Sequence, residues 1–356
     1  MNSFVTIFMG ALGAAVAWII SAPAPFLTGP ATFVTICAIL FRINCEISIP
    51  IRNISFLVIG ISTAEGIDSK VLSNLLKWPI SLIGMILSII TVVFLGKYIF
   101  QEFFKMRKND AILASTPGHL SYVLSLSESY SGNTAVISLI QSIRVLTLTL
   151  AVPGTITFFT DYEMELIPSS DLVLSYPHLI ILTMLSAAVG LILFYYKTPA
   201  AFLLGGMFCS TVGHGTNLTP GVVPEYLATS AFIILGSLIG SRFTGISLET
   251  FKSYVFMGSL FTAFSLLIAI ITALVISNST EFTFIEILIA IAPGGLETMI
   301  VMGQLVGADP TFVAFHHLAR LFILLFLLSI MIKKQRELIP KNLIPRLLSL
   351  RTIKAY

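Results

Sequence analysis

Long apolar runs separated by short polar stretches occupy almost the whole chain. The stretches "FVTIFMGALGAAVAWII" (4–20) and "WPISLIGMILSIITVVFLGKYIF" (78–100) are typical. About 20 consecutive apolar residues cross the hydrocarbon core of a bilayer as a helix. The runs predict helical segments near 3–21, 25–43, 53–66, 78–100, 111–128, 134–159, 177–196, 200–213, 227–243, 253–277, 284–305 and 310–332.

Composition supports the same conclusion. Of 356 residues, 56% are hydrophobic and only 10% are charged, whereas soluble domains carry about 25% charged residues. We therefore predict an all-α, polytopic membrane protein whose main partner is the lipid bilayer. The C-terminal stretch 333–356 is basic but too short for a DNA-binding domain, so no nucleic-acid partner is expected.

The second half of the chain repeats the first at a constant offset. The stretch "STPGHLSYVL" begins at residue 115 and "IAPGGLETMI" begins at residue 291, which is 176 positions later (291 − 115). Without gaps, this offset pairs Pro117 with Pro293, Gly118 with Gly294, Leu120 with Leu296, Arg144 with Arg320, and Gly60 with Gly236. Self-similarity at a fixed offset marks a duplicated unit. The sequence predicts a first membrane repeat at 1–170, a second at 171–332, and a basic cytoplasmic tail at 333–356.

Equivalent loops of the two repeats carry opposite charge. The loop after the fourth run is basic in the first repeat and acidic in the second: Lys97, Lys105, Arg107 and Lys108 against Glu281 and Glu286. The sign reverses after the last run, where 161–171 is acidic and 333–356 is basic. Because cytoplasmic loops are enriched in Lys and Arg, equivalent loops should lie on opposite faces. This arrangement requires an odd number of crossings per repeat. We expect two inverted repeats of about five crossings each, with both termini in the cytoplasm.

One segment of each repeat is interrupted by proline and glycine, at 111–128 and 284–305. If these segments are re-entrant, each repeat crosses five times and the loop charges agree. Irregular backbone at membrane depth is tolerated only where it is buried in protein or lines a cavity. Matching broken segments in inverted repeats point to a substrate site near the midplane. The alternative is a kink that neighbouring helices repair.

The two breaks supply the first set of candidate binding residues. Proline lacks an amide donor and glycine leaves helical geometry easily, so backbone groups are freed to bind ions. The predicted substrate-binding residues at the breaks are Pro117, Gly118, His119, Pro293, Gly294, Gly295 and Glu297.

Ionisable side chains in apolar segments are functional candidates by default. The candidates for ion coupling are Glu297, His119, Glu128 and His317. Glu297 could instead pair with an arginine, and His119 could be a hydrogen-bonded structural imidazole.

Arg144 and Arg320 lie about ten residues inside the final helix of each repeat and complete the predicted substrate site. Each could bind a carboxylate with two parallel hydrogen bonds. Each could also hold the broken segment in place by pairing with Glu297 or Glu128. Asn133 and Asp309, just before these helices, are typical N-cap residues.

The blocks "STPGHLSYVLSLSESYSGNTAVISLIQSIRV" and "IAPGGLETMIVMGQLVGADPTFVAFHHLARL" resemble the duplicated motifs of the AbrB family of bacterial integral membrane proteins. This family is distinct from the soluble DNA-binding regulators of the same name. The resemblance implies a multi-pass protein of the plasma (inner) membrane. Some members are linked to regulation of gene expression, and others are labelled ammonia monooxygenases. The chain departs from the family pattern at His119, where a second glycine is usual, and at Thr298, which separates a Glu and a Met that often adjoin.

The function expected first is secondary transport or export of a small polar solute, including an anion, coupled to H⁺ or Na⁺. The second expectation is a membrane sensor that alters gene expression through a cytoplasmic partner. A membrane monooxygenase ranks third, because the sequence holds no metal or flavin motif. We therefore expect no enzyme activity, no cofactor and no metal, and a homo-oligomer stays open.

Overall fold

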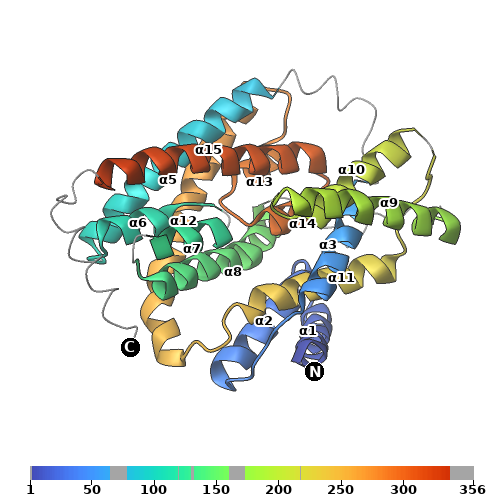
Figure 1. The fold of residues 1–356 in the computed structure, drawn as a ribbon, viewed down its shortest axis with the longest axis horizontal. Coiled ribbons are helices and arrows are strands. Elements are labelled where there is room, and N and C mark those ends of the chain that lie inside the picture. The colour runs from blue at the N-terminus through green and yellow to red at the C-terminus, as the bar shows by residue number, and fades with distance from the viewer. Residues whose placement is uncertain are drawn as a thin grey trace, which may run out of the picture.

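Helices form nearly all of the regular structure in the computed structural model, which describes residues 2–64, 78–118, 120–129, 132–159, 173–216 and 218–336 (Figure 1). Outside the helices, the described residues contain one isolated bridge between Val173 and Val222. The helices in the first half are α1 (Asn2–Ile19), α2 (Pro25–Leu40), α3 (Ile49–Thr63), α5 (Pro79–Glu102), α6 (Lys108–Ser115), α7 (Leu120–Ser129) and α8 (Thr134–Phe159). Those in the second half are α9 (Tyr176–Tyr195), α10 (Ala201–Gly215), α11 (Glu225–Ser241), α12 (Leu248–Ser277), α13 (Phe284–Ile291), α14 (Leu296–Leu305) and α15 (Pro310–Arg336).

Five of the described helices are long and apolar enough to span a membrane, namely α5, α9 and α12 together with parts of α8 and α15. Further apolar helices are shorter, among them α1, α2, α3 and α11. Many large apolar side chains point outward, for example Phe4, Phe256 and Phe326, which are each about 70% exposed or more. Outward-facing apolar surface on this scale requires lipid rather than water. The predicted all-α, polytopic membrane architecture is confirmed.

The predicted segments match the helices closely, with two instructive differences. The helix α3 starts at Ile49 rather than near 53, because Pro50 occupies the first turn, where its missing N–H costs nothing. Each Pro-Gly segment is divided into two short helices, α6 and α7 in the first half and α13 and α14 in the second.

The helices pack as two bundles, and each bundle draws on both halves of the chain. The first bundle contains α1, α2, α3, α9, α10 and α11, and the second contains α5 to α8 and α12 to α15. In Figure 1, α9 and α10 lie at the right, whereas α5, α6 and α12 lie at the left. The bundles meet where α2 and α11 contact α8 and where α3 contacts α14. The predicted boundary between residues 170 and 171 divides the sequence, but helices from both sides of it pack together in each bundle.

Within the first bundle, equivalent residues make exchanged contacts. The Cα of Gly60 on α3 packs against the carbonyl of Leu203 on α10 so closely that a Cβ would collide. The Cα of Gly236 on α11 packs in the same way against the carbonyl of Leu27 on α2. Both pairs of positions are related by the 176-residue offset. This reciprocity is what a two-fold relation between duplicated units produces.

Each broken segment returns to the end from which it started. Asp110, in the first turn of α6, accepts a hydrogen bond from the backbone N–H of Asn133, just before α8, at 3.1 Å. Phe282, just before α13, stacks on Phe312 in the first turn of α15, with ring centroids 4.7 Å apart. The starts of α6 and α8 are therefore neighbours, as are the starts of α13 and α15. Pairs α6–α7 and α13–α14 are accordingly hairpins, here named the first and second hairpins.

Candidate functional site

The second hairpin is held open by two side chains of α15. Helix α13 ends at Ile291, and the backbone then bends through residues 292–294 to Gly295, the N-cap of α14. Arg320 donates to the carbonyl oxygens of Ala292 and Gly294, each at 2.7 Å. The ring of His317 bonds the carbonyl oxygen of Ile289 at 3.0 Å.

The first hairpin has the same arrangement on α8. Arg144 donates to the carbonyl oxygen of Thr116 at 3.0 Å. Gln141 donates to the carbonyl oxygens of Leu113 and Thr116, each at 2.9 Å. The 176-residue offset relates Gln141 to His317, Arg144 to Arg320, Leu113 to Ile289 and Thr116 to Ala292. The duplication therefore extends to individual hydrogen bonds.

These arginines act as clamps on the backbone of the breaks. The last carbonyls of a helix have no partner within it, and a cation is favourable at that negative end. Arg144 and Arg320 are buried, at 3% and 2% exposure, and supply these missing donors. The expected pairing of either arginine with Glu297 or Glu128 is not what the structure shows. Glu128 is exposed, and the guanidinium groups donate to backbone carbonyls of the breaks instead, of which those of Thr116 and Ala292 also accept the N–H of Gly118 and Gly294.

A third arginine, Arg242, reaches the same region from the first bundle. It forms the C-cap of α11 and is half-buried. Its charge interacts with that of Glu297, and Arg144 interacts with the charges of both Arg320 and Arg242. Three guanidinium groups and one carboxylate thus gather where the hairpins meet the first bundle.

Sequence reasoning assigned no site role to Arg242. The structure places Arg242 close enough to Glu297 for their charges to interact. The only available signal is weak: its counterpart at the 176-residue offset is Gly66, so only the second repeat has a base at this point.

The other predicted binding residues lie at or beside the two breaks. Pro117, Pro293 and Gly294 are buried, and Gly118, Gly295 and Glu297 are half-buried. His119 lies outside the described residues. Glu297 is in the first turn of α14, where a carboxylate complements the helix dipole.

The two predicted N-caps are also present, at the starts of the helices that carry the clamps. The side chain of Asn133 accepts from the backbone N–H of Val136 at 3.3 Å. Asp309 accepts from the backbone N–H groups of Thr311 at 2.8 Å and Phe312 at 3.4 Å. These caps fix where α8 and α15 begin, and hence the depth of Arg144 and Arg320.

Several polar atoms around the clamps have no hydrogen-bond partner within the described part of the chain. They are Nε of Arg144, Nε of Arg320, Oε1 of Gln141 and Nδ1 of His317, and all are buried. Buried polar atoms normally have hydrogen-bond partners, so these atoms are available to hydrogen-bond a polar ligand. Among the residues described, no group of three or more His, Cys, Asp or Glu side chains is arranged to hold a metal ion.

The family model described as "Transition state regulatory protein AbrB" matches residues 26–335, which include both hairpins and both clamps. The chain belongs to the AbrB family. A relative from Bacillus subtilis (strain 168), "Uncharacterized protein YhjN", is 26% identical over 293 residues, covering 76% of this chain and 75% of that protein. A relative from Escherichia coli (strain K12), "Putative regulator AbrB", is 22% identical over 320 residues, covering 85% of this chain and 87% of that protein.

Proposed function

We propose that this AbrB-family protein is a secondary transporter for a small organic anion, coupled to H⁺ or Na⁺. Charge is the observation that carries the proposal. The charges of Arg144, Arg320 and Arg242 influence one another, and within the described part of the chain Glu297 is the one carboxylate that interacts with any of them, through Arg242. Arg144 and Arg320 are buried. Uncompensated charge in such a place is costly, and a bound anion would offset it.

The position of this cluster supports a transport role. Ligand sites favour the boundaries between packed units, and the cluster joins the C-terminal end of α11 in the first bundle to α14 in the second. The amide of Gln304 on α14 also crosses this boundary, donating to the carbonyl of Ser62 on α3 at 3.1 Å. A relative movement of the bundles would open and close the space around Glu297.

The geometry of the clamps restricts how an anion would bind. Both terminal nitrogens of Arg320 already donate to backbone carbonyls, so its two-pronged face is occupied. Arg144 and Arg320 would then act as fixed positive charges, and the free amides at the start of α14 together with Arg242 would contact the anion directly. Glu297 would carry the coupling ion, because its negative charge attracts H⁺ or Na⁺ and, until it is neutralised, repels an anionic solute.

The proposed topology follows from the loop charges. We place the two repeats in inverted orientation in the plasma (inner) membrane, with both termini in the cytoplasm. The basic loop that contains Lys105 would then face the cytoplasm, and the acidic loop that contains Glu281 would face outward.

The test is flux into proteoliposomes under an imposed pH or Na⁺ gradient, with a panel of radiolabelled small carboxylates. We expect gradient-driven uptake of at least one member by the wild type. The variant Glu297→Gln should lose gradient-driven uptake while keeping its thermal stability. The matched control is Glu249→Gln, which changes an exposed glutamate on α12 and should transport normally. Wild-type coupling in Glu297→Gln contradicts the assigned role, and no uptake by the wild type of any member contradicts transport.

A second candidate is regulation of gene expression through a partner at the cytoplasmic face. It rests on the description of the family model and on the printed name of the Escherichia coli relative. Under this proposal, removal of residues 337–356 would change transcript levels while leaving flux in proteoliposomes unaltered. Transcript profiles identical to the wild type contradict it.

A further inference from the structure

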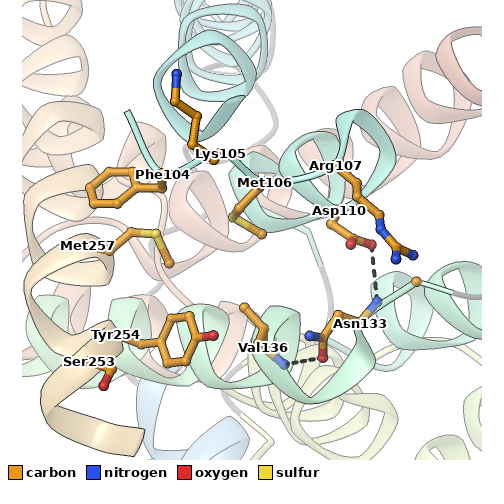
Figure 2. A pocket seen from close by; sticks show the side chains of 11 residues that line it. Phe104, Lys105, Met106, Arg107, Asp110, Asn133, Val136, Ser253, Tyr254 and Met257 are labelled. Carbon is orange, nitrogen blue, oxygen red and sulfur yellow. Dashed lines mark hydrogen bonds between the residues drawn. The ribbon is translucent and has the colours of Figure 1, made fainter. Parts of the chain in front are cut away.

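A cavity of about 570 Å³ lies at the start of the first hairpin, and none of its lining residues belongs to the breaks (Figure 2). It is bounded by the loop between α5 and α6, by the start of α8 and by the first part of α12. The residues that line it are Phe104, Lys105, Met106, Arg107, Asp110, Gly132, Asn133, Val136, Ser253, Tyr254 and Met257. Figure 2 shows Met106, Val136 and the ring of Tyr254 around the opening.

At the equivalent position of the second hairpin, aromatic side chains of the protein pack together. At the 176-residue offset, Met106 corresponds to Phe282, Val136 to Phe312 and Tyr254 to Trp78. Phe282 stacks on Phe312, and the ring of Trp78 lies 5.6 Å from that of Phe312. Trp78 and Phe312 are at most 1% exposed. The smaller residues of the first repeat leave unfilled a volume that the second repeat fills with rings.

The polar part of the cavity favours a negative charge. Arg107 is an exposed cation on the rim, and its counterpart in the second repeat is the neutral Thr283. The N-terminal ends of α6 and α8, with their positive dipole ends, both line the cavity. Asp110 is the only carboxylate among the lining residues, and it already accepts the backbone N–H of Asn133.

We propose that this cavity binds a small aromatic carboxylate. Its ring would occupy the space between Met106, Val136 and Met257, which corresponds to the aromatic cluster of the second repeat. Its carboxylate would contact the guanidinium group of Arg107, the side-chain amide of Asn133 and the hydroxyl of Tyr254. If the proposed transport function holds, the cavity is the cytoplasmic entrance for the solute. Binding itself does not depend on that function.

The test is equilibrium dialysis of radiolabelled benzoate against the purified full-length protein in detergent. We expect saturable binding by the wild type. Val136→Phe introduces the ring that the second repeat has at this position and should abolish binding. Arg107→Thr removes a charged hydrogen bond and should weaken binding about tenfold. The matched control is Val212→Phe, which makes the same change at an exposed position of α10 and should bind benzoate like the wild type.

Three results would overturn the proposal: no saturable binding by folded wild type, unchanged binding by Val136→Phe, or competition by uncharged benzyl alcohol as strong as that by benzoate. Complete displacement of benzoate by phosphatidylglycerol would assign the cavity to a lipid headgroup and would also overturn it. Absence of gradient-driven uptake in proteoliposomes, together with saturable benzoate binding that Val136→Phe abolishes, would contradict transport and leave this proposal standing. A failure of the transport proposal is thereby distinguishable from a failure of this one.

Discussion

The first and second hairpins share a backbone clamp but differ in almost everything around it. In both, an arginine and a second polar residue one turn earlier bind backbone carbonyls at the break. Only the second hairpin has a carboxylate in the first helical turn after its break, because Glu297 corresponds to Ser121. Both copies of the duplicated unit therefore keep the side-chain donors that bind the backbone carbonyls of the break. Side chains that could recognise a solute or ion have diverged.

The starts of the two hairpins differ in the same way. The second start is closed by Trp78, Phe282 and Phe312, whereas the first is an open cavity with Arg107 at its rim. A protein whose two membrane faces differ in function requires such differences between otherwise equivalent hairpins.

The largest effect should come from removing a clamp, and it should differ between the hairpins. Arg320→Ala leaves two carbonyls without a charged donor, so we expect a loss of about 3–5 kcal/mol in the free energy of unfolding. Arg144→Ala should cost only about 1–2 kcal/mol, because Gln141 still donates to the carbonyl of Thr116. Denaturant titration in mixed micelles measures both losses.

The control for this comparison is Lys252→Ala, at an exposed position of α12, which should change stability by less than about 0.5 kcal/mol. Equal losses for Arg320→Ala and Arg144→Ala would show that the count of carbonyl bonds does not set the strength of the clamp.

A smaller effect is expected from exchanging the second clamp residue between repeats. Gln141 and His317 bond equivalent carbonyls, so His317→Gln should unfold within about 1 kcal/mol of the wild type. His317→Ala should be clearly less stable, since the carbonyl of Ile289 then loses its donor. If His317→Gln keeps stability but loses gradient-driven flux, the imidazole carries a proton as well as capping the helix. Unfolding of His317→Gln as easily as His317→Ala contradicts the shared clamp.

The smallest effect concerns the cap of α15. Burial raises the pKa of Asp309, the backbone N–H groups of Thr311 and Phe312 oppose that shift, and the charge of Glu286 adds to it. A carboxyl with a raised folded pKa binds its proton more tightly in the native state than in the unfolded state. It therefore adds stability as the pH falls through the window between its folded pKa and its lower unfolded pKa.

Asp309→Asn installs the residue that the first repeat has at this position and cannot titrate. We expect the unfolding free energy of the wild type to rise relative to this variant as the pH falls from about 7 to about 4, by less than about 1 kcal/mol. Unfolding titrations at several pH values measure the difference, and a difference that does not vary with pH is the contrary outcome.

Much of the fold could be predicted from the sequence because a membrane imposes long apolar runs, and because duplication provides an internal comparison. The positions of α5, α9 and α12 and both breaks follow from these two features. The partners of Arg144 and Arg320 could not be predicted, since side-chain charges suggest carboxylates, whereas the guanidinium groups bind backbone carbonyls. The approach of Arg242 to Glu297 depends on how the two bundles meet, which no local pattern encodes. The aromatic cluster joins residues more than 200 positions apart in the sequence, Trp78 with Phe282 and Phe312. It therefore could not be predicted from a local pattern either.

The central proposal is that the two hairpins start from opposite faces of the membrane. Lys105 and Glu281 are equivalent positions before the two hairpins, and both are exposed. Single cysteines at these positions, in a variant lacking Cys37, Cys45 and Cys209, can be labelled with a membrane-impermeant maleimide in intact and in permeabilised cells. Under the inverted topology, the cysteine at position 281 is labelled in intact cells and the one at position 105 is labelled only after permeabilisation. Labelling of both positions from the same side would contradict it.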